Sequence, residues 1–321
     1  MIRLLVRTVA LLAALVVLNF FIPRLLPGDP LDALAAGEQE AGLAPLSAGA
    51  RENLRRYYGL DRDRAGQFIA ALTMLAQGDL GWSYAKSRPV RDLIAERLPW
   101  TVGLVGAAAG SAALLGITLG LLAAWRGGRA DRALVSFAST TEAIPDFLIG
   151  MGLLLAFAVG LRWFPLSGSR TLFAPGDGLP AAIDTLWHLT LPYLALTVSS
   201  FAVFLLLTRH STAETVRAPF VAVARAKGLA DRTILVRHVL PNALPPIATL
   251  LALRLGAVLG VAIVIERLFG VPGVGLLAFE AIRERDYPVL QAVFLLSGAA
   301  IIIATAAVDA TLLLVRPHGA R

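Results

Sequence analysis

Four charged side chains lie in or beside apolar stretches long enough to cross a membrane: Glu142, Asp146, Arg254 and Asp309. A charge at the centre of a membrane helix costs about 2.5 to 3.5 kcal/mol on insertion scales, so each calls for an explanation. Three explanations are possible for such charges. They can form an ion pair inside the membrane, for example between Arg254 and an acid, they can lie near the membrane interface, or they can line a water-filled pathway. Glu142 and Asp146 flank Pro145 and would share a helix face if the helix continued through the proline.

Catalytic chemistry finds little support in the sequence. Gly81-Trp82-Ser83-Tyr84 has the Gly-x-Ser pattern of a serine nucleophile, but it lies in a predicted outer loop and not in a span beside a histidine. The four histidines form no HExxH pair, so no metal site is expected. Neither lysine, Lys86 or Lys227, fits a phosphate-binding loop. We therefore expect no catalytic residue, and no ATP hydrolysis by this chain.

The composition is that of an integral membrane protein. Of 321 residues, 57% are hydrophobic and only 16% are charged, and the mean hydropathy is +0.72. An apolar stretch of about 20 residues crosses the hydrocarbon core, so the chain has room for several spans and no large soluble domain. It contains no cysteine, which excludes disulfides, thiol nucleophiles and thiolate metal sites.

Apolar runs predict an all-α membrane protein with six transmembrane helices, at 4–22, 100–124, 137–160, 187–208, 247–266 and 288–315. The predicted organisation is a first helix at 1–22, an outer segment at 23–99, a five-helix core at 100–315 with a loop at 209–246, and a tail at 316–321. The first helix has the basic start of a signal peptide but no small-x-small cleavage site before Pro23, so we interpret it as a retained span.

The basic residues predict the orientation. With the N-terminus inside, short inner segments carry thirteen Lys and Arg residues and short outer loops carry five, while 23–99 carries ten basic and ten acidic residues. Lys and Arg favour the cytoplasmic side, so both termini are expected there. The net charge of +7 is thus a topology signal, and no basic stripe with interleaved aromatic residues suggests a nucleic-acid partner.

The outer segment 23–99 is expected to contain short helices. A turn is predicted at 26–30, which contains two prolines. Apolar residues then recur at helical spacing in two places: Phe68, Ile69, Leu72, Leu75 and Ala76, and then Val90, Leu93, Ile94 and Leu98. We interpret this segment as a small helical cap outside the membrane; a solvated linker is the alternative.

The inner loop 209–246 is predicted to fold into two short helices. Gly228 is expected to stop the first helix, Asp231 to cap the second, and Pro241 to end it. This compact surface either lies on anionic lipid headgroups or fits a groove on a cytoplasmic partner. Glycine pairs Gly106/Gly110, Gly116/Gly120 and Gly256/Gly260 allow close helix crossing elsewhere.

The same loop resembles the cytoplasmic motif of ABC importer permeases, Glu-Ala-Ala, three residues, Gly, nine residues and Ile-x-Leu-Pro. Here Ala222-Val223-Ala224 is followed by Gly228 and by His238-Val239-Leu240-Pro241, without the Glu and Ile. The form ARAKGL…RHVLPNALPP resembles the dipeptide/oligopeptide/nickel branch of this family. Further segments resemble it along nearly the whole chain: 26–30, 59–61, 78–83, 88–90, 97–99, 143–145, 266–269, 272–275 and 285–289.

The resemblance implies a type I ABC importer permease, which forms half of a pathway for peptides or related small solutes. It implies coupling to a separate ATPase through Ala222, Ala224, Arg225, Lys227, Gly228, Leu240 and Pro241. Implied partners are a related second permease, two cytoplasmic ATPase subunits or domains that use ATP and Mg, and an extracytoplasmic substrate-binding protein. This chain itself is expected to bind no cofactor. The expected location is the lipid of a bacterial or archaeal cytoplasmic membrane.

Two questions stay open at this point. Dipeptides, longer peptides, nickel chelates, glutathione and opines all suit this branch, because specificity would reside mainly in the binding protein. An ion-coupled secondary transporter is the alternative function, since six spans with buried charges suit it too. Two similar halves would indicate such a carrier, and the sequence shows no internal repeat.

Overall fold

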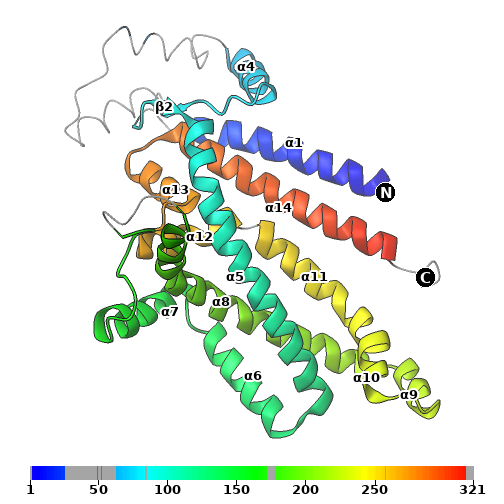
Figure 1. The fold of residues 1–321 in the computed structure, drawn as a ribbon. Helices are drawn as coiled ribbons and strands as arrows, with labels where there is room; N and C mark the ends of the chain where they lie inside the picture. Colours follow the sequence, from blue (N-terminus) through cyan, green and yellow to red (C-terminus); the bar gives the residue numbers. More distant parts are fainter. Residues whose placement is uncertain are drawn as a thin grey trace.

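The computed structural model describes residues 2–25, 49, 52, 63–83, 85–171, 178–256 and 258–315, and these residues are mostly helical (Figure 1). Five helices are long and apolar enough to cross a membrane. Two bent helix pairs bring the candidate spans to as many as seven. A many-span helical protein, as predicted, is confirmed, but several predicted boundaries differ. The predicted turn at 26–30 lies outside the described residues.

The first and last spans pack side by side (Figure 1). Helix α1 covers Ile2–Leu25 and α14 covers Tyr287–Val315, close to the predicted 4–22 and 288–315. A Cβ at Gly298 of α14 would lie 2.7 Å from the Leu15 side chain, so the missing side chain permits this close packing. Arg7 Nη2 and Asp309 Oδ2 are 2.5 Å apart and link the two helices by an ion pair.

At the far end of α1 lie helix α4, Arg64–Ala76, and a two-stranded hairpin made of β1, Trp82–Ser83, and β2, Arg88–Pro89. The strands pair antiparallel, with Trp82 opposite Pro89 and Ser83 opposite Arg88. The Asp63 carboxylate caps α4 by accepting from Gly66 N at 3.1 Å. Phe68 stacks edge-on against Phe20 of α1 at 5.1 Å between ring centroids. The first predicted helix of this segment is thus present.

Two long helices form the centre of the molecule: α5, Val90–Arg126, and α8, Leu179–Val216. At 1.5 Å per residue, the 38 residues of α8 span about 57 Å, well beyond a hydrocarbon core of about 30 Å. Both helices extend past the predicted 100–124 and 187–208. The apolar positions from Val90 onward are therefore the first turns of α5 and not a separate short helix.

The α5–α8 contact is the most extensive between helices of the described chain, and glycines make it close. A Cβ at Gly116 would lie 2.6 Å from Phe204 Cβ, and one at Gly120 would lie 2.7 Å from the Leu205 carbonyl oxygen. A Cβ at Gly106 or Gly110 would meet nothing within 4 Å. Only the second of these two glycine pairs therefore serves a crossing within the chain.

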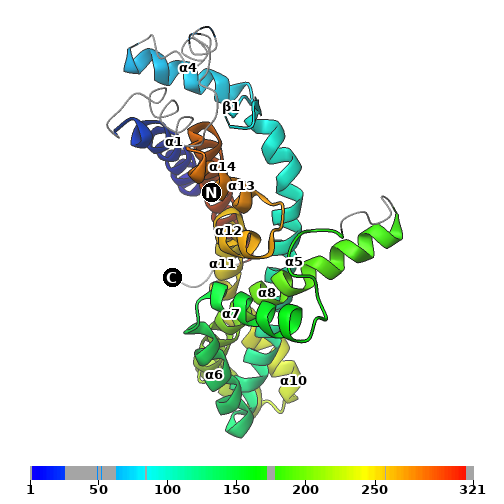
Figure 2. The same ribbon diagram turned by 90° about the vertical axis from the view of Figure 1, so that its left-hand side faces the viewer.

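The predicted span 137–160 is not one helix. It is divided between α6, Gly128–Glu142, and α7, Asp146–Leu153, which continues as the π-helix η1, Leu154–Gly160. The two parts are bent by 98° (Figure 2). Pro145 lacks an N–H donor and disfavours helix in the residue before it, so the helix breaks there. Glu142 and Asp146 consequently lie on different helices, so the condition for a shared helix face, a helix that continues through Pro145, is not met.

The predicted inner loop 209–246 is much shorter in the structure. Helix α8 continues to Val216, and the short helix α9, Pro219–Ala226, follows. Then α10, Asp231–Ile234, the π-helix η2, Leu235–Val239, and α11, Leu240–Gly256, run on as one candidate span, Asp231–Gly256. Asp231 is the first residue of this span and makes no side-chain cap.

Pro241 does not end the second helix, contrary to our expectation. The π-helix precedes it directly, and Leu240 N donates to Leu235 O in the wider π pattern. Such a wide turn shifts the backbone hydrogen bonds and so accommodates a residue that lacks an N–H. The segment 231–241 is thus the beginning of a long helix.

The predicted span 247–266 is likewise divided, between α11 and α12, Val258–Phe269. Residues Ala262–Phe269 of α12 form a bent pair with α13, Val274–Arg283, at an angle of 85°. Gly270, with φ +66°, and Pro272 lie in the bend. Because Gly adopts positive φ freely, the chain can make this sharp bend without backbone strain at Gly270.

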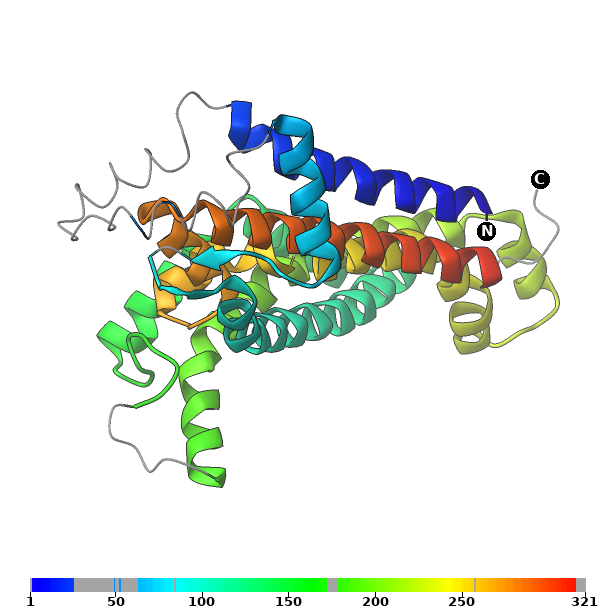
Figure 3. The ribbon, with the colours of Figure 1, turned by 90° about the horizontal axis from the view of Figure 1, so that it is seen from above.

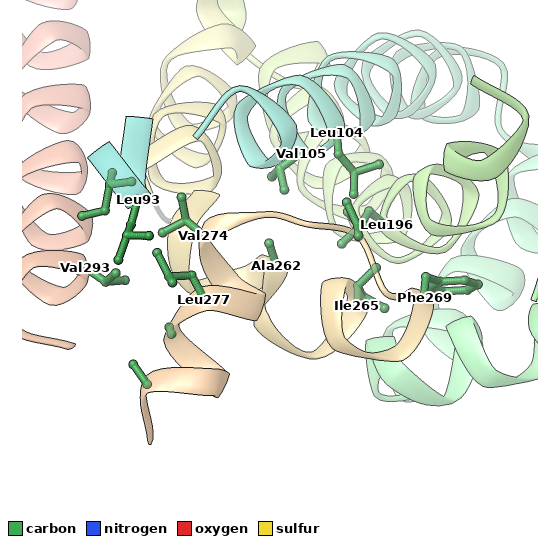
Figure 4. Close-up of a cluster of buried hydrophobic side chains, with 14 of the residues drawn as sticks. Leu93, Leu104, Val105, Leu196, Ala262, Ile265, Phe269, Val274, Leu277 and Val293 are labelled. Carbon is green, nitrogen blue, oxygen red and sulfur yellow. The ribbon is translucent and has the colours of Figure 1, made fainter. Parts of the chain in front are cut away.

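The main core surrounds the α12–α13 pair (Figure 4). Ala262, Ile265 and Phe269 of α12, and Val274 and Leu277 of α13, are all at most 2% exposed. They pack with apolar side chains of α5, α8 and α14, including Leu93, Leu104, Val105, Leu196 and Val293. The core thus fixes the bent pair against three of the candidate spans.

The molecule has two distinct ends along its long helices (Figure 3). One end carries α4, the hairpin and α13, and we refer to it as the hairpin end. The other carries α9, the first residues of α1 and the last residues of α14, and we refer to it as the α9 end.

Candidate functional site

Helix α9 is held against the rest of the chain by a small hydrophobic cluster of its own. Val221 and Ala224 on α9 pack with Ile234, Leu235 and Val239 on α10 and η2, and all five are buried. Partly buried Leu121, Trp125 and Val216 border this cluster from the ends of α5 and α8. The Arg225 guanidinium lies 5.2 Å from the Trp125 ring centroid, as in a cation–π contact. The short helix is therefore a fixed part of the fold.

The opposite side of α9 is exposed and partly apolar. Phe220 and Val223 are 42% and 53% exposed, and Leu229 after the helix is 39% exposed. Ala222, Arg225 and Lys227 are exposed beside them. We call these six residues the α9 surface. It combines apolar and basic side chains on a protruding helix (Figure 1), as a partner-binding surface does.

The structure separates the seven residues implied by the motif. Ala222, Arg225, Lys227 and Gly228 lie exposed on and after α9. Leu240 and Pro241 lie in the long helix that follows. Ala224 is only 5% exposed and faces the chain's own hydrophobic cluster. The resemblance implies a coupling role for Ala224, and in this position its small side chain permits the packing of α9 on α10.

Gly228 ends α9 with φ +74°, a conformation that other residues adopt only with strain. A Cβ there would meet nothing within 4 Å. Gly is thus favoured at this position by the backbone conformation and not by a lack of space. This conformation sets the direction in which the chain leaves α9.

The four intramembrane charges do not come together. Asp309 pairs with Arg7. Glu142 is exposed at the end of α6, and Asp146 begins α7. Arg254 is half-buried near the end of α11, and within the described chain it forms no ion pair with any of these acids.

A cavity of about 640 Å³ lies between α5 and α8 towards the hairpin end. Its lining is mostly apolar and includes Trp100, Leu104, Leu189, Thr190 and Tyr193. The Tyr193 hydroxyl donates to Ser111 Oγ at 2.7 Å. None of the four charges lines this cavity.

Sequence reasoning missed two polar contacts that the fold creates. Arg209 of α8 binds Asp131 of α6, and Glu266 of α12 is completely buried and accepts hydrogen bonds from Thr101 of α5 and from Leu276 N. Glu266 had a usable signal in the sequence: an acid in an apolar stretch followed by Pro272, Gly273 and Gly275. Asp131 and Arg209 had none, because 78 residues separate them.

No group of three metal-ligating side chains occurs in the portion of the chain that the structure describes. The candidate site is the α9 surface together with the helix contacts described above.

Comparisons with known proteins find related membrane permeases. A family model described as "Binding-protein-dependent transport system inner membrane component" matches residues 116–318. The glutathione transport system permease protein GsiC of Pectobacterium atrosepticum is 36% identical over 299 residues, covering 93% of this chain and 91% of the relative. A Sinorhizobium fredii protein named "Probable peptide ABC transporter permease protein y4tP" is 32% identical over 319 residues, covering 98% of this chain and 97% of the relative.

The fold also matches a solved structure, an inward-facing MetNI methionine ABC transporter. The TM-score is 0.51 at 16% sequence identity, and the match covers 70% of this chain and 97% of the solved chain. This likeness concerns the fold. The family match and the long alignments to permeases show that the chain belongs to the family of inner-membrane permease components of binding-protein-dependent ABC importers.

Proposed function

We propose that this permease forms half of a pathway for peptides or related small solutes, and that the α9 surface receives the movement of a cytoplasmic ATPase. The observation that carries the proposal is a helix packed on the ends of α5, α8 and α10 by one face, with an apolar and basic face left exposed. A push on such a helix would act directly on the ends of three candidate spans, because α10 begins the span Asp231–Gly256.

The ATPase is a separate subunit in systems of this family, and the permease family normally binds no cofactor. We propose that two ATPase subunits or domains bind and hydrolyse ATP with Mg. The second half of the pathway would be a related permease, and an extracytoplasmic binding protein would deliver cargo to the hairpin end, where α4 and the hairpin lie.

The protein is a multi-pass component of the inner membrane. We propose that both termini are cytoplasmic. The excess of Lys and Arg at the α9 end supports this orientation, and α9 lies at the same end as the first residues of α1 and the last of α14 (Figure 3). Reporter fusions after residues 130 and 230 should report cytoplasm, and fusions near 60, 175 and 280 should report the outside.

The cargo is proposed as a peptide or a peptide-like molecule such as glutathione. Relatives named for glutathione and for peptide transport support this class. The mostly apolar cavity between α5 and α8 has no fixed charge in its lining, so this chain would accept different side chains, and the binding protein would select among them.

The test is uptake into vesicles that contain this chain, its partner permease and the ATPases, with ATP inside and ionophores collapsing all ion gradients. Uptake should persist without a gradient. Asn or Gln variants of Glu142, Asp146 and Asp309 and a Gln variant of Arg254 should keep ATP-dependent uptake, because none of these residues lines the cavity between α5 and α8 and an ATP-driven permease needs no coupling ion. Uptake that needs a gradient and ignores ATP would overturn the proposal.

The docking surface has its own test. Val223→Glu places a charge on the exposed apolar face of α9, so ATPase association should fall at least tenfold with the permease still inserted. Ile69→Glu is the matched control, since Ile69 is 63% exposed on α4 at the opposite end. Unchanged ATPase association in the Val223 variant would leave α9 as a helix lying on lipid headgroups.

A further inference from the structure

Glu266 is a buried carboxylate that the proposed coupling mechanism does not use. It is 0% exposed. Its Oε1 accepts from Thr101 Oγ1 of α5 at 2.6 Å, and its Oε2 accepts from Leu276 N at 2.9 Å. Thr101 Oγ1 in turn accepts from Val274 N at 2.8 Å. The carboxylate and the hydroxyl thus occupy the N-terminus of α13, whose free N–H groups and helix dipole favour negative charge.

Two glycines make room for this carboxylate. A Cβ at Gly273 would overlap the Glu266 carboxyl group, and a Cβ at Gly275 would lie 2.9 Å from Oε2 and 2.7 Å from Ile263. No side chain larger than hydrogen therefore fits at either position without displacing Glu266. In the sequence Pro272-Gly273-Val274-Gly275, the two glycines leave the space that the Glu266 carboxyl group occupies.

The other end of α13 is attached to the hairpin. Lys86 Nζ lies 3.1 Å from Glu280 Oε2 and 3.2 Å from Glu284 Oε1. Ser83 Oγ donates to Asp286 Oδ2 at 2.5 Å. The hairpin runs directly into α5, since β2 ends at Pro89 and α5 begins at Val90. Val90 N also donates a hydrogen bond to Gly81 O at 2.9 Å, which ties the first turn of α5 to the start of the hairpin.

Apolar packing joins the same elements between these polar contacts. Val90, Leu93 and Ile94 at the start of α5 belong to the same core cluster as Leu277 and Ala281 on α13, and all are at most 5% exposed. Figure 4 shows Leu93 and Leu277 in this cluster. The two ends of α13 and its buried face are thus all fixed to α5 or to the hairpin.

We propose that the hairpin, the first turns of α5 and the α12–α13 pair move as one rigid body during transport, and that Glu266 is the residue that positions α13 on α5. We call this body the Glu266 unit. Sliding α13 away from α5 would deprive the buried Glu266 carboxylate of one of its two donors, Thr101 Oγ1 on α5 or Leu276 N on α13, which is strongly unfavourable. Opening of the pathway at the hairpin end therefore displaces the Glu266 unit as a whole. The inference rests on the proposed transport function.

The chain contains no cysteine, so introduced cysteines report without background. A Lys86→Cys, Glu284→Cys pair, joined by a short cleavable dithiol-reactive linker, would replace the ion pair with a covalent bond between the hairpin and α13. ATP-driven uptake by the linked protein should stay within twofold of the unlinked protein. A loss of tenfold or more that reduction reverses would mean that α13 moves against the hairpin, and would overturn the proposal. A pair that fails to link in the membrane would contradict the contacts on which the unit depends.

The role of Glu266 is tested by labelling Ala281→Cys, a position 2% exposed, with a membrane-impermeant maleimide. Adding Thr101→Val should raise the labelling rate at least tenfold, while adding the conservative Thr101→Ser, which keeps the hydroxyl, should leave it unchanged. Equal rates in the two variants would show that the contact does not position α13. Labelling needs no ATP or cargo, so its result does not depend on the proposed function. If the proposed transport function is wrong, the Lys86→Cys, Glu284→Cys protein will show no ATP-driven uptake even before it is linked.

Discussion

Arg209 of α8 and Asp131 of α6 are joined by two hydrogen bonds, from Nε to Oδ1 at 3.1 Å and from Nη2 to Oδ2 at 2.8 Å. The Asp131 residue is only 8% exposed. A planar guanidinium matches a carboxylate in this paired geometry, which a lysine cannot reproduce. The contact fixes the beginning of α6 to α8 about two turns before α8 ends near the α9 surface.

Arg209→Lys should therefore destabilise the protein by about 1 kcal/mol, the range of a partly exposed ion pair. Thermal unfolding of the purified permease in detergent is the measurement. The loss should not add to that of Asp131→Asn, because the two changes remove one shared contact. Fully additive losses would contradict this coupling.

Gly116→Ala should destabilise the α5–α8 crossing by about 1 to 3 kcal/mol, because its Cβ would lie 2.6 Å from Phe204 Cβ. Gly106→Ala is the matched control on the same helix, where a Cβ meets nothing within 4 Å. The control should be neutral or slightly stabilising, since Ala favours helix over Gly. The melting temperatures of the two variants provide the comparison, and equal temperatures would argue against the close crossing.

Gly228→Ala should cost about 1 kcal/mol at the backbone, because φ is +74° and the surrounding space is open. The chain leaving α9 would change direction, so uptake per ATP hydrolysed should fall while membrane insertion stays normal. Gly152→Ala is the control, since Gly152 is helical and equally open. If uptake per ATP hydrolysed is unchanged in the Gly228 variant, the left-handed backbone conformation at this position is not needed for coupling.

Ala224→Glu and Ala222→Glu form a pair that separates folding from docking. Ala224 is buried in the cluster beneath α9, so a glutamate there should unseat the helix and lower thermal stability. Ala222 is exposed, so the same change should leave stability unchanged and weaken ATPase association. The reverse pattern would mean that α9 presents its other face to the partner.

The hairpin contacts of Lys86 should be lost at high pH. Burial opposes its charge, but hydrogen bonds from Lys86 to Glu280 and Glu284 outweigh this and raise the pKa of Lys86 above its ordinary 10.5. Because the folded pKa is raised, the stabilisation is fully present below about pH 10.5 and is lost as pH rises through the folded value. A spin label on Ala85→Cys should gain mobility across that range.

In the Lys86→Met variant the spin label should already be mobile at neutral pH. Its mobility should change little when the pH is raised through the range in which Lys86 loses its proton in the parent protein. A label that gains mobility with the same alkaline midpoint in this variant would show that another group controls the hairpin.

The sequence by itself determined the features that depend on local composition. Apolar runs predicted membrane helices at 4–22 and 288–315 almost to their ends, and helical spacing around Phe68 predicted α4. The motif around Gly228 indicated the family, because its signal is a set of residues adjacent in the chain. The positive φ of Gly228 also agrees with its predicted place at the end of a helix.

Tertiary structure decided where the apolar stretches bend and which polar groups meet. Hydropathy averages over a window, so it did not detect the breaks at Pro145 and Gly270 or the continuation through Pro241, where a π turn accommodates the missing N–H. The contacts of Asp131 with Arg209 and of Glu266 with Thr101 join residues 78 and 165 positions apart. Ala224 has the same residue type whether it faces a partner or its own core, and only the packing of α9 on α10 places it inside.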